Sequence, residues 1–229
     1  MIIKVCGMRD ADNIRAVEQL DIDWMGFIFW RDSPRYVAQI NSRAGIIPDY
    51  AQQSLYSTAS TAAKAVKRVG VFVDDMPQNI VTRVYNYDLD IVQLHGSESA
   101  VMIENLRCTL HPDIKPGIQI MKALSISSVA DVEKTKEYLG YVDYFLFDTK
   151  TPLMGGSGTQ FDWSVLRAYD GEVPFLLSGG IGPDDVERIK SFQHPRCAGI
   201  DLNSRFETAP AVKDVERLRR FLCELRVMN

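Results

Sequence analysis

The stretch Pro174–Glu207, PFLLSGGIGPDDVERIKSFQHPRCAGIDLNSRFE, contains one strand–helix–strand unit. Its two apolar runs, PFLLS from Pro174 and CAGIDL from Cys197, are typical of short buried strands. Between them, Gly182-Pro183-Asp184-Asp185 puts a proline and two acids in the first turn of a predicted helix. Strands joined by a crossover helix lie parallel, and nearly continuous apolarity indicates that both faces of their sheet are buried.

Six further runs of this kind lie upstream: IIKVC from Ile2, WMGFIF from Trp24, RVGVFV from Arg68, DIVQLH from Asp90, IQIMKAL from Ile118 and DYFLF from Asp143. Eight strand–helix units in 229 residues predict an α/β fold of the (β/α)8 TIM barrel type, with eight parallel strands. The spacing leaves no linker, so we expect a single domain over residues 1–229. An open doubly wound sheet is the alternative.

Helical periodicity lies between the runs and is clearest near the end of the chain. There, one predicted face carries Val212, Val215, Leu218, Leu222 and Leu225. Ser128 and Asp131 resemble a capping box that opens another helix, which Gly140 could end. Residues 44–66 are rich in Ala, Ser, Thr and Gln, and they lengthen the second crossover as a helix with an exposed insertion.

Composition and charge favour a small-molecule partner. The formal net charge is −4 with scattered basic residues, which does not predict nucleic-acid binding. No apolar run approaches the roughly 18 residues of a membrane span, and the opening MIIKVCGMRD does not resemble a signal peptide. The four cysteines lie far apart without CxxC spacing, which fits reduced thiols in a cytoplasmic protein.

Catalytic groups of a barrel should lie at the carboxyl ends of its strands. Cys6 directly follows the first run and Asp148 directly follows the sixth, on roughly opposite sides of the ring. A carboxylic acid and a thiolate facing each other can move protons in opposite directions at one substrate, which suits an isomerase. Without that context, such a cysteine is usually a small buried apolar residue and such an aspartate a cap.

Glycine-rich loops predict a site for a phosphate group. SGGIG, which includes Gly179 and Gly180, follows the seventh run, and DLNSRFE follows the eighth. Loops at these two positions of a barrel commonly bind phosphate through backbone N–H groups. After Asp148, the loop with Gly155 and Gly156 can likewise present N–H groups to a ligand oxygen, or can be a flexible lid.

Metal and cofactor chemistry finds little support in the sequence. Its three histidines, His95, His111 and His194, have no metal-ligand spacing, and neither a Walker A loop nor GxGxxG occurs. His95 ends the fourth run and could touch the pocket or make a structural hydrogen bond. Arg35 in SPRY could pair with a substrate carboxylate through its planar guanidinium. We expect no metal and no cofactor.

Seven motifs together resemble the phosphoribosylanthranilate isomerase family. In order along nearly the whole chain they are KVCGMRD, GFIF with SPRYV, VGVFV, VQLHG, FDTK with GGSG and FDW, LSGGI, and GIDLNSRFE. The resemblance implies a cofactor-free Amadori rearrangement in tryptophan biosynthesis, from N-(5-phosphoribosyl)anthranilate to 1-(2-carboxyphenylamino)-1-deoxyribulose 5-phosphate. It also implies a monomer, the commonest state in the family.

The resemblance assigns a role to several residues. The family's general acid matches Asp148 and its general base Cys6, while Arg35 matches the partner of the anthranilate carboxylate. The residues that match the family's phosphate site are Gly179, Gly180, Asn203 and Ser204. To act as a base, Cys6 should be at least partly thiolate, which a nearby positive charge would favour. Lys4 is a poor candidate for that charge, because the alternation of residues along the strand does not fix the direction of its side chain.

Two departures and two alternatives accompany this interpretation. The segment 47–66 is longer than the family's usual second crossover, and Ala211 stands where glycine is common. One alternative is another phosphosugar-binding barrel enzyme, such as a metal-dependent epimerase or an indole-glycerol-phosphate synthase. The other is a catalytically silent barrel used for binding.

Overall fold

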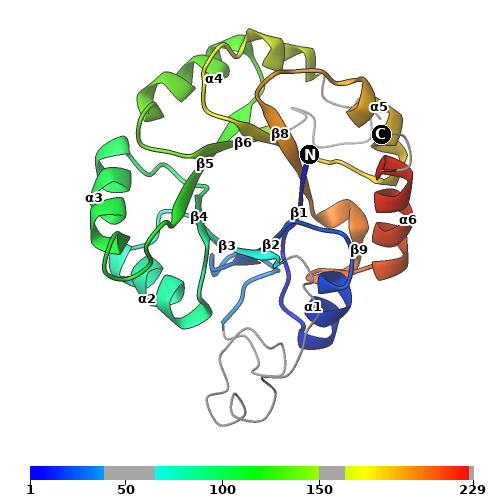
Figure 1. Cartoon of the computed structure of the whole chain (residues 1–229), viewed down its shortest axis with the longest axis horizontal. Coiled ribbons are helices and arrows are strands. Elements are labelled where there is room, and N and C mark those ends of the chain that lie inside the picture. The colour runs from blue at the N-terminus through cyan, green and yellow to red at the C-terminus, as the bar shows by residue number, and fades with distance from the viewer. Residues whose placement is uncertain (39–64, 150–162, 227–229) are drawn as a thin grey trace.

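The computed structural model describes residues 1–38, 65–149 and 163–226. Eight parallel strands close into a barrel in chain order, which confirms the predicted fold class and excludes the open sheet. Figure 1 shows this inner ring with helices around it. The strands are β1 Ile2–Val5, β2 Trp24–Ile28, β3 Lys67–Phe72, β4 Ile91–Leu94, β5 Gln119–Ile126, β6 Tyr144–Thr149, β7 Phe175–Ser178 and β8 Cys197–Leu202.

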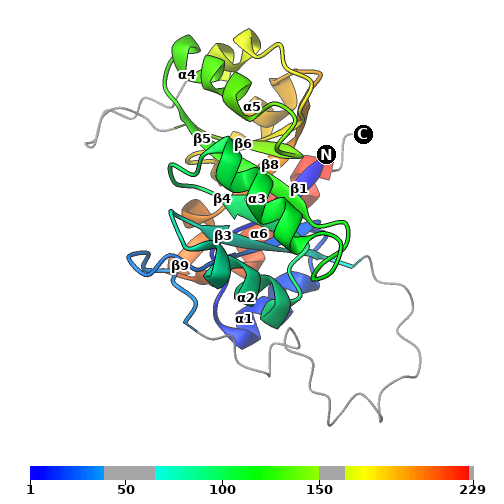
Figure 2. The ribbon, with the colours of Figure 1, turned by 90° about the vertical axis from the view of Figure 1, so that its left-hand side faces the viewer.

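The helices of the described residues cover the outside of this ring. They are α1 Ala11–Glu18, α2 Pro77–Tyr87, α3 Ala100–Leu110, α4 Val129–Glu133, α5 Val186–Ser191 and α6 Val215–Arg226. Figure 2 shows α2 and α3 side by side against the outer face of β3 and β4. None of the helices in these ranges is long and apolar enough to cross a membrane.

Local signals in the sequence place several helix ends. Asp131 accepts hydrogen bonds from the backbone N–H groups of Ser127 and Ser128, which confirms the predicted capping box. The helix itself is shorter than predicted, because α4 ends at Glu133 and continues as a 3-10 helix to Tyr138. Gly140 follows at a φ of +84°, in the left-handed region that glycine adopts without strain.

The final helix begins later than the periodicity predicts. Val212 does not lie on it but pairs in a short hairpin, formed by β9 Glu207–Ala209 and β10 Val212–Lys213. Ala211 at the turn has a φ of +68°, a conformation that favours glycine, which explains why this position is unusual for alanine. The hairpin lies outside the barrel sheet and precedes α6.

The inside of the barrel changes character along its axis. Trp24, Val69, Ile91, Leu146 and Leu176 form a separate buried apolar cluster. Further along the same strands, at positions of the same parity, the polar Gln93, Asp148 and Ser178 line the pocket together with the apolar Ile28 and Val71, because alternate residues of a strand point to the same side. The barrel is thus filled with apolar side chains at one end, while polar and apolar side chains together line the pocket at the other.

The closure between the first and last strands tolerates no extra atom. β8 pairs with β1 over four residues, with Gly199 opposite Ile2. A Cβ at Gly199 would lie 2.1 Å from the carbonyl oxygen of Ile2, and this backbone atom cannot move away without breaking the strand pairing.

Gly199→Ala should therefore lower the free energy of unfolding by about 3 kcal/mol, measured by urea denaturation. Gly182→Ala is the matched control, since its added methyl group would meet the Arg205 side chain, which can move aside. Equal stability of Gly199→Ala and the parent protein would contradict the tight closure.

Candidate active site

One pocket lies at the carboxyl end of the barrel strands. Its lining comprises Cys6, Ile28, Val71, Gln93, His95, Asp148, Ser178, Gly179, Gly180, Ile181, Asp201, Asn203, Ser204 and Arg205. Six of the nine predicted catalytic and binding residues thus lie together, and His95, which could touch the pocket, also lines it. Arg35 is not among the lining residues, and Gly155 and Gly156 lie outside the described residues.

Cys6 lies directly after β1, as expected, and is held tightly. Its backbone N–H donates to the carbonyl of Leu202 at 2.8 Å, and its side chain packs against Gly26 of β2. A Cβ at Gly26 would lie 2.7 Å from Cys6 Sγ, so a side chain there would displace the sulfur. Only 3% of Cys6 is exposed, and the residue lines the pocket.

Lys4 and Asp201 form a buried ion pair beneath Cys6. The two residues are in register on β1 and β8, and Lys4 Nζ lies 2.9 Å from Asp201 Oδ1. Lys4 and Cys6 are two positions apart, so their side chains point to the same side of the strand. Asp201 also accepts a hydrogen bond from Ser178 Oγ at 3.3 Å. The sequence-based dismissal of Lys4 was therefore wrong, because closure of the barrel turns its side chain inward.

Opposing electrostatic effects act on Cys6. Burial raises the pKa of the thiol, and the nearby ammonium groups of Lys4 and Lys213 oppose this rise without cancelling it. At neutral pH the group is therefore mostly the protonated thiol, less ionised than the sequence suggested. Burial lowers the pKa of the Lys4 ammonium, but Asp201 and Cys6 outweigh burial and raise it overall, so Lys4 stays charged.

Asp148 is the penultimate residue of β6 rather than the first residue of the loop after it, and it lines the pocket. Its Oδ2 lies 3.6 Å from Nε2 of His95, which follows β4. The other ring nitrogen of His95, Nδ1, is 3.3 Å from Gln93 Nε2. Within the described residues, the buried Gln93 Oε1 has no hydrogen-bond partner, which leaves an acceptor for a ligand hydroxyl.

The loops after β7 and β8 also line the pocket. Gly179 and Gly180 have φ values of +97° and +72°, in the left-handed region that favours glycine, and such turns can present backbone N–H groups to an anion. Asn203 and Ser204 follow β8, where Ser204 begins a short 3-10 helix. Arg205 adds a cation that the sequence analysis did not single out, although it lies within the quoted DLNSRFE motif.

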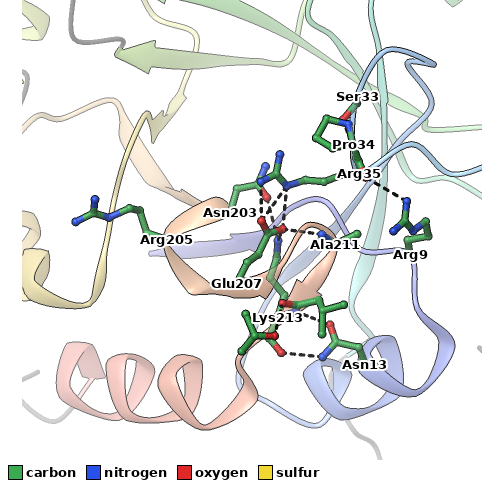
Figure 3. Close-up of polar contacts among 12 residues, drawn as sticks. Arg9, Asn13, Ser33, Pro34, Arg35, Asn203, Arg205, Glu207, Ala211 and Lys213 are labelled. Carbon is green, nitrogen blue, oxygen red and sulfur yellow. Dashed lines mark hydrogen bonds and ion pairs between the residues drawn. The ribbon is translucent and has the colours of Figure 1, made fainter. Parts of the chain in front are cut away.

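Arg35 lies beside these loops in a cluster with Glu207 and Lys213 (Figure 3). Its guanidinium forms a bidentate ion pair with Glu207, and Lys213 Nζ lies 2.5 Å from the same carboxylate. Glu207 and Lys213 were not among the predicted site residues, because nothing in the sequence pattern signals that they face Arg35.

Across residues 1–38, 65–149 and 163–226, no group of three or more His, Cys, Asp and Glu side chains is placed to hold a metal ion.

Comparison with known proteins gives a consistent picture. The family model described as N-(5'phosphoribosyl)anthranilate (PRA) isomerase matches residues 3–224. An N-(5'-phosphoribosyl)anthranilate isomerase of Parabacteroides distasonis is 46% identical over 225 residues, covering 98% of this chain and 93% of the relative. One of Agrobacterium fabrum is 38% identical and covers 96% and 92%.

Solved structures agree with the sequence matches. Phosphoribosyl anthranilate isomerase from Thermotoga maritima superposes with a TM-score of 0.76 at 28% identity, covering 100% of both chains. A phosphoribosyl anthranilate isomerase solved in complex with reduced 1-(o-carboxyphenylamino)-1-deoxyribulose 5-phosphate has a TM-score of 0.74 at 26% identity, again over 100% of both chains.

Breaking the buried ion pair should be costly. Lys4→Met leaves the Asp201 carboxylate buried without its ammonium, and we expect a loss of about 3 kcal/mol in the free energy of unfolding, measured by urea denaturation. The double variant Lys4→Met/Asp201→Asn removes both charges and should recover part of that loss. A double variant less stable than Lys4→Met would contradict the pairing.

The reactivity of Cys6 should report its raised pKa. Because the thiolate is the nucleophile, alkylation of Cys6 by iodoacetamide should be slow at pH 7 and accelerate as the pH rises past the ordinary thiol value of 9.0. Peptide mass spectrometry in a Cys108→Ser/Cys223→Ser background, which removes the exposed cysteines, follows the reaction. A rate already maximal at pH 7 would show a thiolate at rest.

Proposed function

The chain belongs to the N-(5'-phosphoribosyl)anthranilate isomerase family and is an isomerase of this kind, and we propose that Cys6 and Asp148 carry its two proton transfers. The reaction converts N-(5-phosphoribosyl)anthranilate to 1-(2-carboxyphenylamino)-1-deoxyribulose 5-phosphate. The observation that carries the proposal is that a thiol and a carboxyl group line one pocket, together with a glycine-rich loop after β7 and a polar loop after β8.

Asp148 acts first, as the general acid. It donates a proton to the furanose ring oxygen, the bond between that oxygen and C1 breaks, and the ring opens to a Schiff base between C1 and the anthranilate nitrogen. His95, whose Nε2 is 3.6 Å from the Asp148 carboxylate, supports the placement of this group and can exchange a proton with it.

Cys6 acts second, as the general base in its thiolate form. It removes the proton from C2, and the electron pair moves to the cationic nitrogen, which is the electron sink. The resulting enolamine tautomerises to the ketone as C1 gains a proton and the C2 hydroxyl loses one. Lys4 supports this step, because its buried ammonium stabilises the thiolate that burial alone disfavours.

The two ends of the substrate meet different parts of the rim. The phosphate group lies against the backbone of Gly179 and Gly180 and against Asn203 and Ser204, next to the cationic Arg205. The anthranilate carboxylate pairs with Arg35. Gly155 and Gly156 are assigned to substrate binding on the sequence alone.

The wider assignments follow from this activity. We propose that the enzyme serves tryptophan biosynthesis in the cytoplasm, as a single-domain monomer that needs neither metal nor cofactor. Its partner is then the phosphorylated substrate alone.

Cys6→Ser and Asp148→Asn test the acid–base pair. The activity, followed as loss of the anthranilate fluorescence of freshly generated substrate, should fall by roughly 100-fold to 10,000-fold in each variant, because each replaces a proton-transfer group with one of unsuitable pKa.

Circular dichroism and the affinity for a reduced product analogue serve as controls, and both should stay near the values of the parent protein. A folded variant that keeps substantial activity would remove that residue from its role. A parent protein that binds the analogue without turnover would indicate a silent barrel.

A further inference from the structure

We propose that Glu207 and Lys213 are positioning residues that hold the Arg35 guanidinium in one orientation beside the pocket, so that the substrate carboxylate meets a fixed cation. The inference rests on the proposed role of Arg35 in binding that carboxylate. It assigns a task to the β9–β10 hairpin, which is not part of the barrel sheet.

Glu207 binds one edge of the Arg35 guanidinium. Arg35 Nε donates to Glu207 Oε1 at 2.9 Å, and Arg35 Nη2 donates to Oε2 at 2.6 Å. A guanidinium presents five N–H donors in a rigid plane, so two parallel bonds to one carboxylate fix the rotation of that plane. The neighbouring edge, formed by Nη1 and the second N–H of Nη2, is not used by Glu207 and can donate two N–H groups to a second carboxylate.

The hairpin is built to hold Glu207 in place. Glu207 and Lys213 are cross-strand partners in the hairpin, and their side chains meet at 2.5 Å between Glu207 Oε1 and Lys213 Nζ. The backbone N–H of Ala211, at the turn with positive φ, also donates to Glu207 Oε1 at 3.2 Å. Side-chain exposure is 5% for Glu207 and 0% for Lys213, so water does not compete for these contacts.

The charges of the cluster leave room for an anion. Two cations, Arg35 and Lys213, share one carboxylate, so the formal charge of the trio is positive. Burial raises the pKa of Glu207, but the hydrogen bonds from Arg35 and Lys213 outweigh burial and lower it overall, which keeps the carboxylate ionised. Without that carboxylate, the two cations would repel each other and Arg35 would lose its anchor.

The cluster is packed against the backbone that carries Cys6. A Cβ at Gly7 would lie 2.6 Å from Arg35 Cδ and 2.8 Å from Asn203 Oδ1. Lys213 Nζ donates to the same Asn203 oxygen at 2.9 Å. Figure 3 shows Arg35, Asn203, Glu207 and Lys213 converging at this point. The buried Lys213 ammonium thus contacts both Glu207, which binds Arg35 at the proposed carboxylate site, and Asn203, at the proposed phosphate site.

The test compares two ligands in Glu207→Gln. One is reduced 1-(o-carboxyphenylamino)-1-deoxyribulose 5-phosphate, and the other is the same compound with phenyl in place of carboxyphenyl. We expect the first to bind about 10-fold more weakly than to the parent protein, by isothermal titration calorimetry, while the affinity for the second changes by less than about 2-fold. Equal losses for both ligands, or no loss, would overturn the proposal.

Three variants complete the experiment. Glu216→Gln removes one negative charge from an exposed ion pair on α6 and should leave both affinities unchanged. Glu207→Asp keeps the charge but shortens the side chain, so it should show the same selective loss of affinity for the carboxylated ligand. If Glu207→Gln does not fold, Glu207→Asp provides the test. In an Arg35→Met background, Glu207→Gln should cause no further loss for the carboxylated ligand, and an added selective loss there would overturn the proposal.

The same measurements separate this inference from the proposed function. Arg35→Met alone should abolish the preference for the carboxylated ligand. If Arg35→Met weakened both ligands equally, the assignment of Arg35 would fail. If it acted selectively and Glu207→Gln did not, only the positioning role would fail.

Discussion

Closure of the barrel between β1 and β8 is the constraint on which the site depends. The first and last strands pair in one register, which sets Lys4 directly opposite Asp201 although 197 positions separate them in the chain. In this register, the side chains of Lys4, Cys6 and Asp201 all point into the barrel. A shift by one residue would send these side chains to the outer, helix-covered face.

The interior is divided because apolar and charged side chains differ in the free energy that their burial costs. Apolar side chains fill the part where no water enters, as the cluster around Trp24 and Leu146 shows. Charged groups at the other end are costly to bury without a partner, and there Lys4 pairs with Asp201 while Asp148 Oδ2 lies 3.6 Å from His95 Nε2. Burial also raises the pKa of the Cys6 thiol. The charge of Lys4 opposes this rise, because it stabilises the Cys6 thiolate.

The β9–β10 hairpin shows how an element outside the barrel can serve the site. Its two strands are too short to be stable alone and are tied to the barrel by side chains, through Arg35 and Asn203. Placing a carboxylate and an ammonium on facing positions of a hairpin fixes their separation more firmly than flexible loops would. The cost is local, an alanine in the left-handed region at the turn.

The sequence by itself determined the eight strands, their parallel arrangement and the membership of the family, because these follow from local apolar patterns and from motifs that keep their order. It also marked Cys6, Asp148 and the glycine loops, since strand ends of a barrel converge. It did not reveal Lys4, Glu207 or Lys213, and it extended the last helix to Val212, which belongs to the hairpin. Only the tertiary structure decided these points, because the direction of an inward-facing lysine and the pairing of distant charges depend on strand register and barrel closure, which no local pattern encodes.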